Sequence, residues 1–559
     1  MSFLQTTPFY ISTLTPVHIG SGEDYEPGNY LIDKGWLYFF EPAKLAGQLD
    51  DRQQQKLLSI VDKENMDERA LIELQNFFKN LSAVIKPLSQ YQLPVPDGIE
   101  QFYKDKLGKV AQQEGRGQGR VRQKKVANKL EIERAVINHT SGDYYIPGSS
   151  VKGTIRSAII NALKTKDKLT WQEERDLSNR HKSKKLVQDL EKNTLDYQNV
   201  TEDPMKYLKV SDIRFVEPQL PQSTIQFCVN RKRKPTNKQS MAEQKGLYQI
   251  LECIAANHYR SLMGEIRLQT DKDKQLSALG INSVQKLAQF CNQFYLPQLK
   301  QELDELNTLN LLAKDWYKTI MTLFFETLKE PLTNGSVMLL RLGKHGGALS
   351  KTLDGLRWIH IPQHKRMADK PTTIWLAADS QKQKDRLQPF GWVLLEWHNT
   401  ASTHVLKEHL QQAGSILQEK LQQEIERQQE VAQEQQAKRL AEQQYEQQLR
   451  EAEQQKQQAL QQATKGLSGL AVQFAERKIN EQWESDKNKF MASGLIESLL
   501  DELEQQPDKD AVQILGELVE LHIKGLLSNP NATVGKKKKP KYKPRQQTIA
   551  GRLLKLMES

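Results

Sequence analysis

The chain has 559 residues, of which 38% are hydrophobic and 27% charged, and this length predicts two or three structural units. No apolar run approaches the roughly 18 residues that span a bilayer, and the first residues lack the basic start and apolar run of a secretory signal. The three cysteines are too few and too scattered for a disulfide framework or a zinc site. We therefore expect a cytoplasmic protein with no membrane partner, no metal site and no cofactor.

The net charge of +11 comes from 80 Lys and Arg against 69 Asp and Glu. Such an excess suits a polyanionic partner, because each neutralised phosphate releases condensed counterions. Many basic proteins bind no nucleic acid, so the positions of the basic residues matter more than their total.

In chain order, residues 9–19 predict a strand that ends in a turn at residues 20–22. Residues 30–32 and 36–40 predict a hairpin, and residues 55–88 carry helical periodicity. Residues 104–129 hold nine Lys and Arg with several glycines, a composition that predicts a flexible basic arm.

Beyond the arm, the pattern predicts a helix at 151–163 and a pair of strands at 208–215 and 224–229. It then predicts helical stretches at 245–260 and 283–330, and two further strands at 337–342 and 392–397. From about residue 404 Gln and Glu dominate, which predicts a long solvated helix or a coiled coil. Amphipathic helices at 466–528 precede a basic tail at 536–545 and a helix at 549–557. The predicted domains are 1–403, 404–465 and 466–559.

Three glycine-rich basic motifs are candidates for binding. The first, TPVHIGSG at residues 15–22, predicts a strand that enters a tight turn, where glycine allows the backbone to approach a ligand. An ordinary hairpin entry explains the same residues, with His18 as a packing residue.

The second motif, IPGSSVKGTIR at residues 146–156, predicts a strand followed by a helix whose N-terminal N–H groups favour a phosphate. Lys152 and Arg156 lie four residues apart and therefore on one helical face. The alternative is a surface helix capped by Ser149 or Ser150.

The third motif, RLGKHGGALSKT at residues 341–352, has the composition of a phosphate-binding loop. Ser350 stands where the ATPase pattern requires glycine before Lys351, so an ATPase is disfavoured. A glycine-rich basic loop that cradles nucleic acid remains open.

In this order the motifs, together with VSDIRF at 210–215 and PFGWVLLE at 389–396, resemble the RAMP superfamily, and within it the subunit-five family of type III-A CRISPR (Csm) complexes. The resemblance covers about residues 8–398. It implies an α+β fold with a ferredoxin-like (RRM-like) core and helical insertions. It also implies a non-catalytic subunit that caps the 3′ part of the crRNA and supports crRNA maturation and complex assembly in antiviral defence.

The partners implied by the resemblance are crRNA, target RNA, other Csm-type backbone subunits and host nucleases. The implied RNA contacts come from all three motifs: His18, Gly20, Ser21 and Gly22; Gly148, Ser149, Ser150, Lys152 and Arg156; and Lys344, Gly346, Gly347 and Lys351. The Gly-Lys-His-Gly-Gly order of the third motif departs from the family pattern. The extension beyond about residue 404 has no counterpart in it.

Two other functions stay open. An endoribonuclease that cleaves precursor crRNA or target RNA would need an acid/base pair, for which His18 or His139 with Tyr144 are candidates. Turn carboxylates are also candidates for supporting cleavage, although plain solvation explains them as well: Glu23, Asp24, Asp33 and Asp143. A scaffold would recruit a partner through the C-terminal helices.

The two basic segments, 104–129 and 536–545, are further candidates for phosphate contact. Tyr542 in the second of them is a candidate for base stacking.

Overall fold

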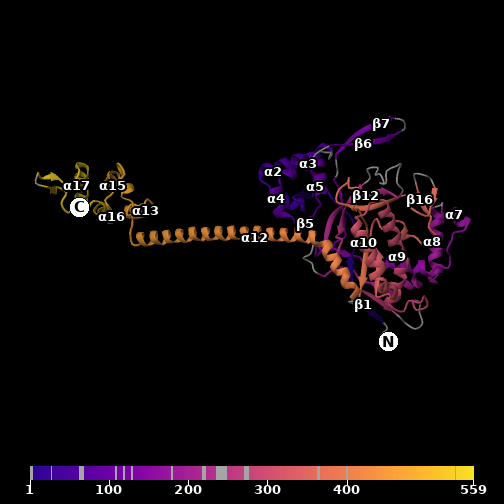
Figure 1. The fold of residues 1–559 in the computed structure, drawn as a ribbon. Helices are drawn as coiled ribbons and strands as arrows, with labels where there is room; N and C mark the ends of the chain where they lie inside the picture. The colour runs from indigo at the N-terminus through magenta and orange to yellow at the C-terminus, as the bar shows by residue number, and fades with distance from the viewer. Residues whose placement is uncertain are drawn as a thin grey trace. The chain divides into compact units, whose positions relative to one another are not determined.

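The computed structural model describes residues 4–26, 28–61, 68–107, 110–117, 120–127, 130–177, 180–216, 222–233, 248–269, 276–361, 366–397, 401–535 and 537–559 (Figure 1). It divides into two compact units, Met1–Glu424 and Ile425–Ser559. The first unit mixes helices and sheets, so the predicted α+β class is confirmed. Within the described ranges, no helix is both long and apolar enough to cross a membrane.

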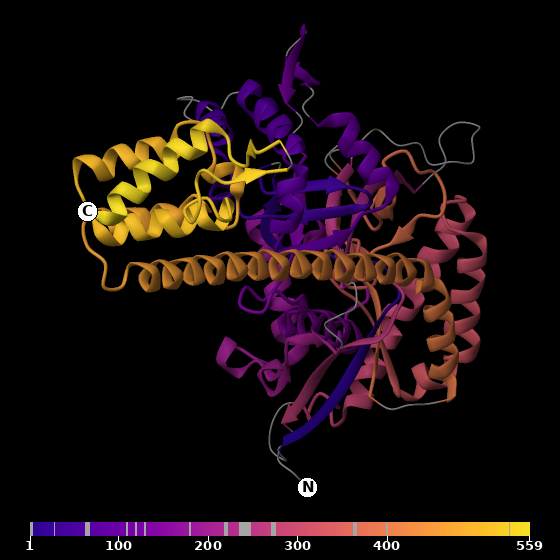
Figure 2. The same ribbon diagram turned by 90° about the vertical axis from the view of Figure 1, so that its left-hand side faces the viewer.

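The larger sheet of the first unit has seven strands and is built around β1 (Leu4–Thr13). Its order is β15-β20-β1-β14-β11-β9, and β10 also pairs with β14. All of these pairs are antiparallel, and β1 lies beside β14 over most of its length (Figure 2). The other strands are β9 (Tyr145–Ile146), β10 (Leu208–Val210), β11 (Ile213–Phe215), β14 (His258–Gln269), β15 (Val337–Arg341) and β20 (Trp392–Glu396).

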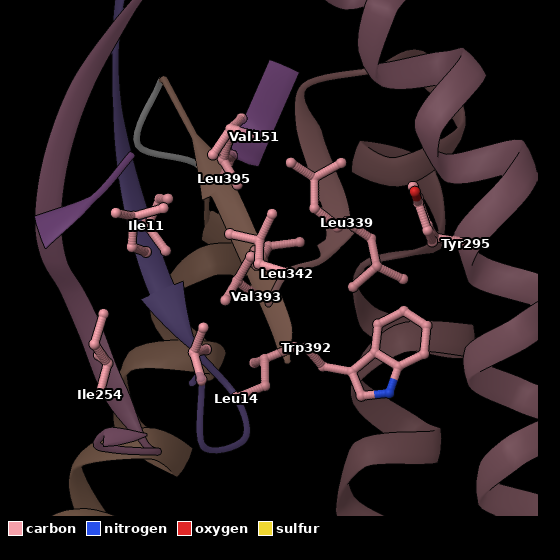
Figure 3. Close-up of a cluster of buried hydrophobic side chains, with 14 of the residues drawn as sticks. Ile11, Leu14, Val151, Ile254, Tyr295, Leu339, Leu342, Trp392, Val393 and Leu395 are labelled. Carbon is pink, nitrogen blue, oxygen red and sulfur yellow. The ribbon is translucent and has the colours of Figure 1, made fainter. Parts of the chain in front are cut away.

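The main core of this unit joins the sheet to two helices, α6 (Gly148–Leu163) and α9 (Val284–Thr308). Val151 of α6 and Tyr295 of α9 lie in the same buried cluster as Leu339, Val393 and Leu395 of the sheet (Figure 3). Each of these side chains is fully buried. Burial of an aliphatic side chain of this size stabilises a fold by about 1.5–3 kcal/mol, so this cluster fixes the helices on the sheet.

A second sheet has six strands in the order β19-β18-β12-β13-β8-β2. Among the described strand pairs of this sheet, β13 and β8 are parallel and the others are antiparallel. The strands are β2 (Gly20–Tyr25), β8 (Ile132–Ala135), β12 (Ser223–Lys232), β13 (Tyr248–Ile254), β18 (Thr373–Ala378) and β19 (Gln388–Pro389). The strands predicted at 208–215 and 224–229 exist, but they belong to different sheets and do not pair.

The hairpin predicted at 30–40 is confirmed as β3 (Tyr30–Asp33) and β4 (Trp36–Phe39), which continue into β5 (Tyr91–Pro94). Lys34 and Gly35 both have positive φ, 52° and 80°, as the two-residue turn of a twisted hairpin requires. The predicted helical stretch that follows forms a separate small core. Its helices are α1 (Pro42–Ala46), α2 (Asp51–Val61), α3 (Glu68–Asn80) and α4 (Ser82–Leu88).

The helical prediction at 283–330 is also confirmed, and the predicted strands near 340 and 395 are β15 and β20. After α9 come α10 (Lys314–Thr322), a π-helical turn (Leu323–Thr327) and α11 (Lys329–Asn334). Further elements of the first unit are α5 (Asp97–Lys106), α7 (Trp171–Leu177), α8 (Arg180–Leu195), β16 (Ile359–Ile361) and β17 (Arg366–Ala368).

Two predictions of secondary structure are wrong in this unit. Of the helix predicted at 245–260, residues 245–247 lie outside the described residues, and the rest is not helical, because β13 and the start of β14 occupy most of it. Ile250 and Ile254 of β13 join the main core, whereas Leu251 and Cys253 join another cluster on the opposite face. A strand that is buried on both faces is a continuous apolar run, which periodicity does not distinguish from a helix. Residues 20–22 are not a turn but the start of β2, which pairs with β8.

The segment predicted as a flexible basic arm at 104–129 begins with the end of α5 and continues as a two-stranded antiparallel ribbon. Its strands are β6 (Val110–Gly117) and β7 (Arg120–Ala127). The pairs of residues between these elements lie outside the described residues. Two strands pair through main-chain hydrogen bonds, which need no apolar side chains. The basic composition of the segment therefore did not indicate the ribbon.

Helix α12 (Ala401–Thr464) covers the Gln/Glu-rich segment, beginning in the first unit and ending in the second. The second unit has its own hydrophobic core. Its other elements are α13 (Leu470–Asn480), α14 (Lys487–Phe490), α15 (Leu495–Gln505), α16 (Lys509–His522), β21 (Thr533–Val534), β22 (Lys539–Pro540) and α17 (Pro544–Glu558). The expectation that Tyr542 is available for base stacking is wrong, because its ring is buried and its hydroxyl donates to the Lys524 carbonyl at 2.9 Å.

Asn292 of α9 provides a test of this arrangement. Its buried amide donates to the carbonyls of Leu332 and Val337 and accepts from the N–H of Leu339, each at 2.8 Å. We expect Asn292→Ala to lower the free energy of unfolding of the first unit by roughly 3 kcal/mol, about 1 kcal/mol for each hydrogen bond removed. Scanning calorimetry measures the change. Gln301→Ala, at an exposed position of the same helix, is the control, and equal stability of the two variants would contradict the prediction.

Candidate nucleic-acid interface

The first and third motifs meet in the folded chain. The N–H of Lys344 donates to the carbonyl of His18 at 2.8 Å. Gly343 has a φ of +79°, and a Cβ at this position would come within 2.3 Å of the same carbonyl oxygen. Glycine is therefore required for two reasons, the left-handed conformation and the close approach of the two main chains. We call residues 18–22 and 343–351 the loop junction.

The side chain of His18 is fully buried beneath the loop junction. Its Nδ1 lies 2.6 Å from the main-chain carbonyl of Glu252, so Nδ1–H donates to that oxygen. Burial lowers the pKa of His18, which keeps the imidazole neutral near pH 7. A Cβ at Gly20 would lie 3.2 Å from its Nε2. His18 thus positions the first motif, in which Gly20 and Gly22 are exposed and Ser21 is half-buried.

The glycine loop of the third motif rests on buried polar contacts. The Arg341 guanidinium is paired with Glu302 at 2.9 Å, and its Nε donates to the Phe390 carbonyl at 3.0 Å. Gly346 and Gly347 lie directly over the Arg341 side chain. This support fixes the main chain of the loop from below.

His345 anchors the same loop from its other side. It has a φ of 62°, its Nε2 lies 2.9 Å from Oε1 of Gln249, and its ring packs on Trp375 and Phe390. Burial, followed by the charge of Lys344, lowers the pKa of His345 to about 3, so its ring is neutral at physiological pH. The side chains that remain for a ligand are those of Lys344 and Lys351.

Those two lysines differ in their surroundings. Lys351 is exposed, whereas the ammonium of Lys344 is paired with the carboxylate of Glu133 on β8. Both members of that pair keep about a third of their side-chain surface in water, 38% and 33%. Two cations and the partly exposed main chain of residues 20–22 and 347 therefore lie at the loop junction, together with the Ser21 hydroxyl, which donates to the Arg134 carbonyl at 3.3 Å. Cations and main-chain N–H groups are chemistry suited to a phosphate.

The second motif lies at another part of the same unit. Helix α6 begins after Pro147, whose side chain offers no acceptor, so the predicted capping by Ser149 or Ser150 is wrong. The carboxylate of Asp212 accepts from the N–H of Gly148 at 2.9 Å instead. A Cβ at Gly148 would come within 2.2 Å of the Val210 carbonyl, so glycine allows the helix to dock on β10 and β11. A phosphate at this end of α6 would have to compete with Asp212.

The two basic residues of the second motif are partly engaged within the protein. Arg156 donates to Asp203 at 2.7 Å and to Glu191 and the Tyr197 hydroxyl at 3.2 Å each. Burial lowers the pKa of Lys152, the largest effect on this half-buried side chain. Farther along α6, the amide of Asn161 accepts from the N–H of Asp354, just beyond the third motif. Helix α6, which begins in the second motif, therefore also contacts the segment that follows the third motif.

The candidate catalytic residues do not form one site. Asp33 is paired with Lys86, and Glu23 is paired with Arg134 at 3.0 Å. Asp24 lies opposite Glu133 in the β2–β8 pair, and burial together with neighbouring carboxylates raises its pKa. Asp143 lies in the turn before β9, where its carbonyl accepts from the N–H of Asn138.

Of the candidate acid/base residues, His18 and Tyr144 are buried and His139 is exposed. The Tyr144 hydroxyl donates to the fully buried carboxylate of Glu252, which also accepts from Tyr25 at 2.9 Å. Burial raises the pKa of Tyr144 well above its usual value. Glu252 also holds His18 through its carbonyl, whereas His139 is exposed in the loop before Tyr144. This network supports the sheet, and it presents neither His18 nor Tyr144 to a substrate.

The sequence interpretation missed the partners that organise these motifs. Glu133, Glu252, Asp212 and Gly343 each contact a motif residue from a distant part of the chain. Gly343 carried a signal, since a glycine directly after a buried strand often allows a sharp change of direction. The carboxylates carried no local signal, because their partners are defined by the tertiary fold.

The family model of the RAMP superfamily matches residues 10–290, half of the chain, and the chain belongs to this superfamily. The predicted family is thereby confirmed, and the match includes the first two motifs. The chain is 25% identical over 358 residues to the CRISPR system Cms protein Csm5 of Methanocaldococcus jannaschii, covering 63% of this chain and 73% of that protein.

Two solved structures are also similar, each at 16% identity over 70% of this chain. One is a chain of a Csm-crRNA-target RNA ternary complex from a type III-A CRISPR-Cas system, matched over its full length with a TM-score of 0.40. The other is Csm5 of T. onnurineus, matched over 99% of its length with a TM-score of 0.37.

The loop junction makes a prediction about two glycines of one loop. We expect Gly343→Ala to lower the free energy of unfolding by about 1–3 kcal/mol, because the substitution forces a left-handed alanine against the His18 carbonyl. Hydrogen exchange at the Lys344 amide should become faster as its bond to His18 opens. Gly346→Ala is the matched control, because its Cβ would meet Arg341 only at an ordinary 3.5 Å. Slow exchange at Lys344 in the Gly343 variant would refute this role.

Proposed function

We propose that this chain is a guide-RNA-binding subunit of a type III CRISPR effector complex of the Csm type, and that it caps the 3′ part of the crRNA. The observation that carries the proposal is the loop junction, where two separate glycine motifs meet through their main chains beside the partly exposed Lys344 and the exposed Lys351. Membership of the RAMP superfamily and the similarity to Csm5 support it.

In this proposal, Lys344 at the loop junction exchanges its present partner, Glu133, for a phosphate of the guide. An ion pair as exposed as Lys344–Glu133 contributes only about 0–1 kcal/mol. A phosphate of the guide can therefore replace Glu133 as the partner of Lys344 at little cost. Lys351 and the main chain of residues 20–22 and 347 supply the other contacts in this proposal, whereas the buried Gly346 supports the loop against Arg341. His18 acts through the position of the main chain.

The second motif contributes a separate contact in this proposal, through Ser149, Ser150 and Lys152 at the start of α6. Arg156 acts indirectly, because its pairs with Asp203 and Glu191 hold α6 against the insertion that contains α8. A guide that follows both surfaces is held by its backbone and not by its sequence, as a subunit that accepts many guides requires.

We also propose that the seven-stranded sheet contains the ferredoxin-like core of the family. The strands β20, β1, β14 and β11 are neighbours in that order, and each pair is antiparallel. Along the chain, α6 lies between β1 and β11, and α9 lies between β14 and β20. This is the arrangement of a β-α-β-β-α-β unit. The six-stranded sheet then grows from insertions into that unit.

The wider assignment follows from the same family. Residues 1–403 bind the guide RNA in this proposal. The partners, in the cytoplasm, are crRNA, target RNA, other Csm-type subunits and host nucleases. Helix α12 and the second unit, in the predicted domains 404–465 and 466–559, are assigned to contacts with neighbouring proteins. The chain acts without cutting RNA itself, consistent with the buried state of His18 and Tyr144.

The test is a double charge reversal at the loop junction, Lys344→Glu with Lys351→Glu. We expect purified complexes to lose guide RNA and to protect fewer nucleotides at its 3′ end. The dependence of log affinity on log salt should become shallower by about 0.7–0.9 for each phosphate that the protein no longer neutralises. Lys318→Glu with Lys329→Glu, at exposed positions of α10 and α11, makes the same change of charge as a control.

Retention and 3′ protection equal to that of the control would contradict the proposal. The endoribonuclease alternative has its own signature, which is metal-independent cleavage of precursor crRNA at one position by the purified chain. Loss of that cleavage in Tyr144→Phe would replace the proposed function with the enzymatic one.

A further inference from the structure

The outward face of the seven-stranded sheet carries an ordered row of side chains that the loop junction does not use. The strand register places Tyr145 opposite Arg214, Arg214 opposite Met263, and Met263 opposite Tyr10. Residues that face one another across neighbouring strands project from the same side of a sheet. These four side chains therefore form one row across β9, β11, β14 and β1, which we call the sheet row.

A second row runs parallel to the sheet row on the same face. Lys209 of β10 lies opposite Arg267 of β14, which in turn lies opposite Thr6 of β1. Arg267 is four residues beyond Met263 and so projects from the same side of β14. Glu265 lies between them and is paired with Arg267 at 2.7 Å.

Burial confirms which way these side chains face. Their neighbours along the strands, including Ile146, Ile213, Leu262 and Ile266, are fully buried in the main core. In contrast, 47% of Met263 is exposed, and the side chains of Lys209, Arg214 and Arg267 are exposed. Tyr10 and Tyr145 are half-buried, so each ring keeps part of its surface in water. Four antiparallel strands thus present aromatic and thioether surface together with cations to solvent.

The exposed charge of this face is mainly positive, and the sheet row continues on β20 with the fully buried Glu396, which lies opposite Tyr10. Arg260 adds a further cation, with its guanidinium 4.4 Å from the centre of the Tyr10 ring. Glu265, which is half-buried, is the carboxylate that lies between the two rows. A ligand of this face must therefore be anionic and must also offer flat apolar surface.

We propose that this face is a second RNA-binding surface, on which unpaired bases of single-stranded RNA stack against Tyr10 and Tyr145 while Arg214, Lys209 and Arg267 contact phosphates. A flat sheet with aromatic side chains on its strands suits splayed bases, whereas paired bases hide their faces within a helix. The centre of a protein–protein interface is depleted of charged residues, so the density of cations favours RNA over a protein partner. This surface is separate from the loop junction, and its RNA need not be the guide.

The test uses the full chain with a fluorescent, unstructured 12-nucleotide RNA and a duplex of the same sequence. We expect Tyr10→Leu with Tyr145→Leu to weaken single-strand binding about tenfold or more, because stacking on an aromatic ring is lost. Tyr10→Phe with Tyr145→Phe retains the rings and should bind within about twofold of the parent chain. Arg214→Glu, at an exposed position that spares the core, should weaken binding and reduce its dependence on salt.

Photo-crosslinking of the same RNA with 4-thiouridine provides a direct readout, with crosslinked peptides expected around Tyr10 and Tyr145. Unchanged affinity in the Leu and Glu variants with no such crosslinks would overturn the proposal. Equal binding of the duplex would also overturn it, as would unchanged RNA affinity together with loss of a neighbouring protein subunit from the complex.

The two sites can fail separately in this design. If the Lys344 and Lys351 reversals release RNA and the sheet-row variants do not, the second surface is wrong and the proposed function stands. The reverse result would leave the sheet row as an RNA surface and remove the loop junction from the proposed function.

Discussion

The contact between the His18 carbonyl and the main chain of Gly343 and Lys344 is the constraint on which the candidate interface depends. It joins a segment that follows the first strand to a loop that follows β15, and the room for it exists because Gly343 lacks a side chain. Beneath it, a neutral His18 binds the main chain of β13, and Arg341 with Glu302 supports the glycine loop. These buried contacts position the main chain that carries Lys344 and Lys351.

The sequence allowed the motifs and most elements to be predicted, but not how the motifs pair. The resemblance of the motifs indicated the family and its α+β class, whereas the hairpin at Lys34-Gly35 followed from a local pattern with a local physical cause. β13 was mistaken for a helix because both of its faces are buried, so it lacks alternation. Arg156 was expected to face RNA, since no local feature reveals that Asp203 and Glu191 lie beside it.

A similar limit applies to the sheet row. β1 does alternate, with Thr6 and Pro8 exposed and Phe9 and Ile11 buried, so its outward positions were readable. That Tyr10 lies in line with Met263, Arg214 and Tyr145 depends on the register of four strands from distant parts of the sequence. Net charge indicated an anionic partner without indicating where it binds. The fold separates the basic residues into those neutralised by carboxylates and those that remain exposed.

The central claim is that the loop junction holds the 3′ part of a guide RNA. The most direct measurement is photo-crosslinking of the assembled complex with a photoreactive nucleotide placed at successive positions of the crRNA, followed by identification of the crosslinked peptides. The account predicts that positions near the 3′ end crosslink to peptides containing residues 18–22 and 343–351. Crosslinks of these peptides to the 5′ end of the guide, or to no position of it, would contradict the account.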